Sequence, residues 1–165
     1  MRALVALTLA AAVAAPVAFA QAPATPPTKT FTSSSEVQAL IQKAKADRKG
    51  DAPLVAEPIL SLAPYRAQLE YRPGTSPAAV HEKDTELMYV LEGTGTIVTG
   101  GKLVEEKRTN ANNLSGTSIE GGKPQALAKG DFVIVPENTP HQITPGGGAP
   151  IVLMTMHAPR PVNWP

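Results

Sequence analysis

The chain of 165 residues carries 15 basic and 14 acidic side chains, three histidines and no cysteine. This near-neutral balance, with no basic patch, argues against nucleic acid as a partner. The lack of cysteine excludes disulfides and thiolate metal sites. The length fits one domain that is large enough to bury a hydrophobic core.

The first twenty residues have the pattern of a secretory signal peptide. Arg2 supplies a positive charge, residues 3–17 are apolar, and Ala18-Phe19-Ala20 has the small residues of a cleavage site. The apolar run is shorter than the ~20 residues that a membrane span needs. We therefore expect cleavage after Ala20, a periplasmic or secreted protein, and no membrane association after cleavage.

A linker and a helix are expected next. Residues 21–32 are rich in proline and small residues, which is typical of a flexible linker. Ser33 and Glu36 then match a capping box, in which two side chains satisfy free amides at a helix start. Apolar residues follow at helical spacing, at Val37, Leu40, Ile41 and Ala44. Gly50 is a natural end, so the sequence predicts a helix over residues 33–50.

The remaining residues, 51–165, read as an all-β domain. Short strand-like runs, such as residues 59–62 and 67–71, are separated by prolines and glycines. Regular spacing of this kind indicates a sandwich or a small barrel. A polar insertion at residues 108–122 has two interpretations that the sequence leaves open: a lid or binding loop, or a surface hairpin.

The stretch from His81 to Gly93 joins a histidine, a carboxylate and a strand. Side chains of a strand alternate between its two faces, so Glu86 shares a face with Met88 and Val90. A carboxylate at the head of a buried face is costly unless it is paired or bound to a cation.

A second stretch supplies a partner for the first. It runs from Gly130 to Ile143 and contains a strand-like run, a turn and a histidine, with key residues Gly130, Pro136, Asn138 and His141. In order and spacing, the two stretches resemble the two motifs of the cupin superfamily, over roughly residues 71–157. The resemblance implies an all-β fold, a single cupin jelly-roll barrel with a short N-terminal helix. It also implies a small-molecule ligand or substrate, and it is compatible with a homodimer.

Two motif positions depart from the family pattern, and one of them is Pro145, which replaces the asparagine that often follows the second-motif histidine. The first motif has two histidines one residue apart, and here Ala79 stands in the first position and His81 in the second. A different register would put Val80 and Glu82 in these positions. We prefer the first register, because it keeps His81 on the inward face with Glu86.

The resemblance implies a metal site built from His81, Glu86 and His141. Two imidazoles and one carboxylate with open positions suit a divalent metal ion such as Fe, Mn, Ni or Zn. Gln142 and Glu82 are weak candidates for a further ligand, and His157 is the weakest, because the sequence does not determine the face on which it lies. The alternative is that both motif histidines are core or rim residues of a barrel that has lost its metal.

Two classes of function follow. The first is an exported metal-binding cupin that acts on a small organic molecule by dioxygenase chemistry or by isomerase or lyase chemistry. The second is a non-catalytic module that binds a small ligand or a metal. The choice depends on whether a metal with open positions is present.

Overall fold

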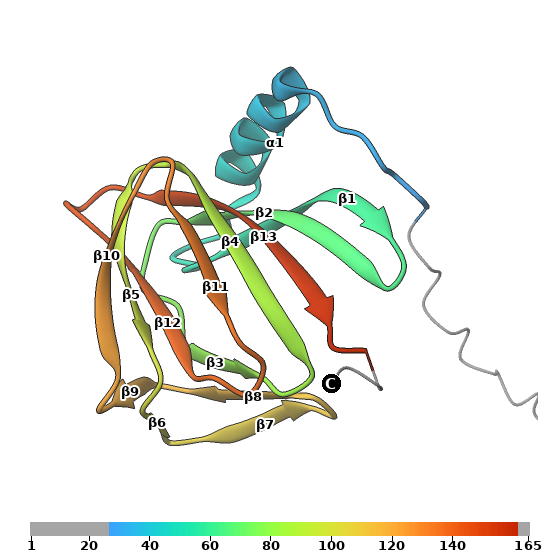
Figure 1. Cartoon of the computed structure of the whole chain (residues 1–165). Helices are drawn as coiled ribbons and strands as arrows, with labels where there is room; N and C mark the ends of the chain where they lie inside the picture. Colours follow the sequence, from blue (N-terminus) through green and yellow to red (C-terminus); the bar gives the residue numbers. More distant parts are fainter. Residues whose placement is uncertain (1–26, 162–165) are drawn as a thin grey trace, which may run out of the picture.

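The computed structural model describes residues 27–161 (Figure 1). Helix α1 (Ser34–Asp47) begins after Ser33, whose hydroxyl accepts a hydrogen bond from the Glu36 amide while the Glu36 carboxylate accepts one from the Ser33 amide. This is the predicted capping box. The helix ends before Gly50, because Arg48 already has an extended conformation with ψ at 122°.

Two antiparallel sheets form the barrel. The first sheet has the order β1-β2-β13-β4-β11, with bounds β1 (Val55–Leu62), β2 (Tyr65–Arg72), β4 (Asp84–Glu92), β11 (Phe132–Val135) and β13 (Ile151–Pro159). The second sheet has the order β10-β5-β12-β3-β8-β7, with bounds β3 (Ala78–His81), β5 (Thr94–Thr99), β7 (Lys107–Asn110), β8 (Asn113–Gly116), β10 (Lys123–Ala128) and β12 (His141–Pro145). Strands β6 (Lys102–Val104) and β9 (Ser118–Glu120) pair with each other. The predicted all-β jelly-roll barrel with one short helix ahead of it is confirmed.

Two apolar clusters hold these layers together. One lies between the two sheets and consists of Met88, Val90, Ile97, Leu127, Val135, Ile143, Ile151 and Leu153. The other forms where Ile41 and Ala44 of α1 pack with Leu69 of β2 and Val152 of β13. The helix therefore covers the outer face of the first sheet (Figure 1), and the inner face of that sheet is left for the barrel interior.

Strand β4 has the alternation that its sequence predicts. Glu86, Met88 and Val90 are buried, and the residues between them are only half-buried. The strand ends just before Gly93, which has φ at 82° and lies so close to Pro150 that a Cβ atom would meet the Pro150 carbonyl oxygen at 2.4 Å. Glycine is required there by both the backbone conformation and the space.

The polar insertion is part of the sheets. Its strand β8 forms an antiparallel hairpin with β7 at the exposed edge of the second sheet, which agrees with the hairpin interpretation, and the lid or binding loop stays a prediction. Its strand β8 pairs with β3, with Asn113 opposite His81 and Leu114 opposite Val80. Its strand β9 pairs with β6. The insertion therefore supplies the neighbour that holds β3 in place, and β3 carries one of the candidate ligands.

Several expectations concern features that lie outside this barrel. The predicted signal peptide, residues 1–20, lies outside the described residues, and so does the linker up to residue 26. The described end of the linker contacts β1, where Lys29 pairs with Ser61. Within residues 27–161, no helix has the length and apolar character to span a membrane. The homodimer stays a prediction.

Candidate metal centre

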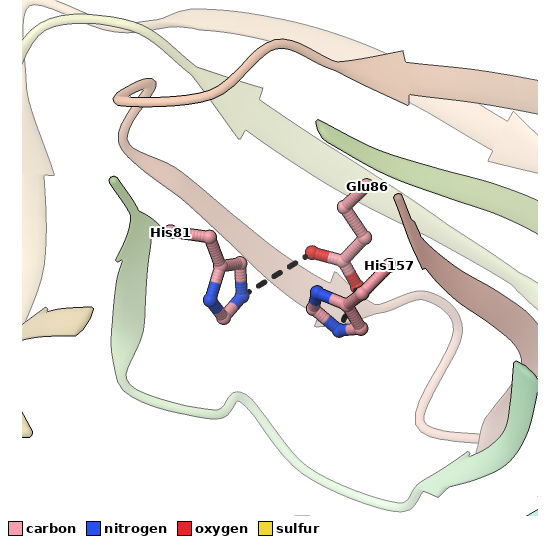
Figure 2. Close-up of side chains that lie close together, drawn as sticks. All are labelled: His81, Glu86 and His157. Carbon is pink, nitrogen blue, oxygen red and sulfur yellow. Dashed lines mark ion pairs between the residues drawn. The ribbon is translucent and has the colours of Figure 1, made fainter. Parts of the chain in front are cut away.

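All three histidines of the chain converge on one carboxylate. They come from three different strands, β3, β12 and β13, and the carboxylate is that of Glu86 on β4. The Nε2 atom of His141 lies 3.1 Å from Glu86 Oε2, that of His81 lies 3.5 Å from the same oxygen, and that of His157 lies 3.7 Å from Glu86 Oε1. Figure 2 shows His81 to the left of the Glu86 carboxylate and His157 just below it, with dashed lines marking the ion pairs.

The Glu86 carboxylate is buried without conventional partners. The residue is only 2% exposed, and its Oε2 atom accepts no hydrogen bond from the described residues. Burial raises the pKa of this carboxyl group, but the nearby imidazoles of His141 and His81 outweigh burial and hold the pKa well below its usual value. Glu86 is therefore a buried anion that only the histidines, or a cation among them, can stabilise.

Two of the histidine rings are held by a hydrogen bond at Nδ1, the nitrogen that faces away from Glu86. His81 Nδ1 lies 3.0 Å from Asn113 Oδ1, and His141 Nδ1 lies 3.1 Å from the carbonyl oxygen of Thr139. A carbonyl oxygen can only accept, so Nδ1 of each ring carries the proton and the neutral ring turns the lone pair of Nε2 toward Glu86. Metal-binding histidines are commonly fixed in this way by a second hydrogen bond.

This arrangement brings lone pairs against a negative charge. A neutral imidazole whose bare Nε2 faces a carboxylate at about 3 Å is repelled, unless a proton or a metal cation lies between the two atoms. Burial lowers the pKa of His81, but Glu86 and Asn113 together raise it above its ordinary value, so a proton on His81 can remove the repulsion. A divalent cation bound to both the imidazole nitrogen and the Glu86 carboxylate would also remove the repulsion.

The third histidine reaches the site through strand register. His157 on β13 lies directly opposite Glu86 on β4, so the two side chains share a face. The ring packs edge-on against that of His81, with centroids 4.6 Å apart. Its Nδ1 atom is buried and has no hydrogen-bond partner among residues 27–161, with Asp84 Oδ2 at 4.0 Å. Burial is the main cause that lowers the pKa of His157, so this ring favours its neutral, metal-binding form.

The second motif fixes the first through its turn. Asn138 has φ at 56°, a left-handed conformation that asparagine tolerates better than most residues. Its amide donates a hydrogen bond of 2.7 Å to the carbonyl oxygen of His81. The turn that leads into His141 is therefore bonded to the residue that ends β3, which aligns both histidines with Glu86.

Comparison with known proteins identifies the architecture. No family model and no curated protein sequence matches the chain. Among solved structures, a Klebsiella pneumoniae protein with a double-stranded beta-helix domain has a TM-score of 0.53 at 15% identity, over 81% of this chain and 91% of that one. The cupin domain of Schizosaccharomyces pombe Cnp3 has a TM-score of 0.51 at 13% identity, over 71% and 67%. The chain has the cupin fold.

Two further similar structures have names that refer to a metal or an activity. HppE in its Fe(II) form has a TM-score of 0.52 at 18% identity; the match covers 67% of this chain and 54% of that one. The DMSP lyase DddQ from Ruegeria pomeroyi has a TM-score of 0.52 at 15% identity, over 86% and 71%. At these identities the likeness establishes the cupin fold alone.

Those residues fit a metal ion. The ligand atoms of His81, Glu86 and His157 all lie within 4.8 Å of one another. Two ligands at about 2.1 Å from one cation lie roughly 3.0–3.4 Å apart when they subtend 90–110°, so the Glu86 distances require only small movements. The donors are imidazole nitrogen and carboxylate oxygen, which suit Fe, Mn, Ni or Zn. The cupin barrel therefore contains a candidate site for a divalent metal.

The other candidates from the sequence have different partners. The Glu82 carboxylate accepts two hydrogen bonds from the Arg108 guanidinium, at 2.7 and 3.0 Å. The Gln142 amide donates to the carbonyl oxygen of Ser76 at 2.9 Å. The side chains of Glu82 and Gln142 are hydrogen-bonded to these other partners and not to Glu86. His157, ranked last from the sequence, lies beside Glu86. That ranking was wrong, because the face of β13 depends on its pairing with β4.

Proposed function

We propose that this protein is an exported metal-dependent cupin that acts on a small organic molecule. The observation that carries the proposal is the convergence of His81, His141 and His157 on the buried carboxylate of Glu86. Three imidazoles around one buried carboxylate have little structural purpose, because apolar packing would stabilise the barrel equally well. The same atoms are a complete ligand set for a divalent cation.

The residues of the chain would divide the work as follows. His81, Glu86 and His141 would hold the cation, with His157 as a fourth ligand. Met88 and Ile143, which are almost fully buried, would exclude water from the barrel side of the site. His81 is the most exposed of the ligands, with 19% of its side chain accessible, so the open side lies next to it. A bound divalent cation would supply Lewis-acid polarisation of a substrate oxygen or activation of a coordinated small molecule.

A dioxygenase and an isomerase or lyase are both compatible with this ligand set. Each reaction class needs a cation with open positions and a small organic substrate. A non-catalytic cupin that binds a metal or a small ligand remains the second candidate, and Ala79 favours it, since this position lacks the histidine that the motif expects.

Metal content is the first test. The protein is stripped with a chelator, incubated separately with Fe(II), Mn(II), Ni(II) and Zn(II), and desalted, and the bound metal is measured by elemental analysis. We expect about one metal per chain. No bound metal under any of these conditions would refute the proposal.

Turnover separates the two candidates once a metal is bound. The Fe(II)-loaded protein is supplied with small aromatic and dicarbonyl compounds in air, and oxygen consumption is recorded. The Mn(II)- and Ni(II)-loaded proteins are supplied with sugar acids, and product is analysed. Conversion of a compound by the loaded protein, lost in His141→Ala, would support the enzyme. Binding without conversion would favour the binding module.

A further inference from the structure

One cationic side chain adjoins the candidate metal centre. Arg66 on β2 lies directly opposite His157 on β13, and His157 lies directly opposite Glu86 on β4. Residues directly opposite each other in an antiparallel sheet point to the same face. Arg66, His157 and Glu86 therefore form one row across three neighbouring strands, all on the face that carries the site.

Arg66 is the arginine without a partner. Within residues 27–161, each of the other arginines donates a hydrogen bond to a carboxylate or a carbonyl oxygen: Arg48, Arg72, Arg108 and Arg160. The Arg66 side chain makes no hydrogen bond and no ion pair with any residue of that range, and it is exposed.

A shallow depression adjoins Arg66 at the β1–β2 edge of the first sheet. It has a volume of about 170 Å³, and Ala56, Pro58 and Gln68 are among the residues that line it. Pro58 is paired with Gln68 and Ala56 with Glu70. Gln68 and Glu70 alternate with Arg66 along β2, so these side chains share the face of Arg66. The depression is smaller than the pockets of drug-sized ligands, which are about 300–1,000 Å³. Its size restricts the ligand to a few heavy atoms.

The charges around the site favour an anion. Glu86 and Asp84 together balance the charge of a divalent cation, and Arg66 then leaves an excess of one positive charge. Strands of a sheet are about 4.8 Å apart, so the backbones of Arg66 and Glu86 are about 10 Å apart. An arginine side chain covers much of that distance. A short ligand whose anionic group is bound to Arg66 could therefore reach the metal with its other end.

We propose that Arg66 binds the carboxylate of a short organic acid and so selects an anionic substrate for the metal centre. This inference rests on the proposed function for the position of the metal, and it adds the substrate class. The guanidinium group presents paired N–H donors that match the two oxygens of a carboxylate. A neutral molecule of the same size would not gain this interaction.

The test compares a carboxylate with a neutral molecule of the same shape. The protein is loaded with Co(II), whose visible spectrum changes when a ligand binds nearby, and titrated with propanoate or with propanamide. We expect Arg66→Gln to weaken propanoate binding about 10- to 100-fold and to leave propanamide binding unchanged. Arg66→Lys keeps the charge without the paired donors, so its propanoate affinity should lie between those of the wild type and Arg66→Gln. Lys102→Gln, on β6, makes the same change in charge elsewhere and should have no effect.

The outcomes separate this inference from the function on which it rests. Metal content is measured for each variant, and every variant should keep about one Co(II) per chain. Unchanged propanoate affinity in metal-loaded Arg66→Gln would overturn the inference and leave the metal site intact. A wild-type protein that binds neither Co(II) nor Fe(II), Mn(II), Ni(II) or Zn(II) would overturn the proposed function; propanoate is then titrated calorimetrically into the metal-free protein. Binding that depends on Arg66 would preserve the anion site, and no such binding would overturn it.

Discussion

Replacing His157 with alanine tests whether the last strand completes the metal centre. Zinc binding at sites with four protein ligands contributes roughly 10–16 kcal/mol. Shared over His81, Glu86, His141 and His157, this is about 2.5–4 kcal/mol for each ligand, or about 70- to 900-fold in affinity. We expect His157→Ala to weaken metal binding by an amount in this range, because its Nε2 lies 3.7 Å from the Glu86 carboxylate.

The assay is a competition for Zn(II) against a chromophoric chelator, with the thermal unfolding of the metal-free protein measured in parallel. Glu82→Gln is the matched control, since Glu82 is bound to Arg108 away from the site, and its affinity should equal that of the wild type. A second variant adds Ala79→His to His157→Ala. Ala79 lies opposite His141 in the ladder, so a histidine there should face the same cation and restore part of the lost affinity.

Two results would refute this reasoning. If His157→Ala folds and binds Zn(II) as tightly as the wild type, His157 is not a ligand and the site has only His81, Glu86 and His141. If Glu82→Gln loses the metal instead, the register chosen for the first motif is wrong.

Three further predictions concern the surroundings of the site and the start of the chain. Asn113→Ala should weaken metal binding about 10- to 100-fold, as loss of outer hydrogen bonds to metal-bound histidines commonly does, because Asn113 holds Nδ1 of His81; chelator competition measures it. Metal binding should weaken as pH falls through the raised pKa of His81, by about tenfold per pH unit for each proton that competes with the metal. Glu86 stays ionised over that range because its pKa is held low, so metal affinity that is flat between pH 8 and 5 would contradict this assignment. Protein purified from the native host should have the mass of a chain that begins at Gln21, and a soluble protein that retains residues 1–20 would contradict export.

Local patterns in the sequence were sufficient for several features. The capping box needs only Ser33 and Glu36, three residues apart, and the structure contains both of its hydrogen bonds. The alternation of β4 predicts that Glu86 faces the interior, and the structure buries it. These features depend on backbone geometry and near neighbours, which the sequence specifies directly. The two motifs likewise indicated the jelly-roll barrel, because their order and spacing reflect its turns.

Strand pairing decided the rest of the candidate site. The face of His157 is set by the pairing of β13 with β4, and a shift of one residue would turn this histidine away from Glu86. The role of Asn113 depends on the pairing of β8 with β3, which the polar composition of the insertion did not indicate. The position of Arg66 beside His157 likewise depends on the pairing of β2 with β13. Register between strands far apart in the chain results from packing of the whole barrel, and so only the tertiary structure brings these side chains to the carboxylate of Glu86.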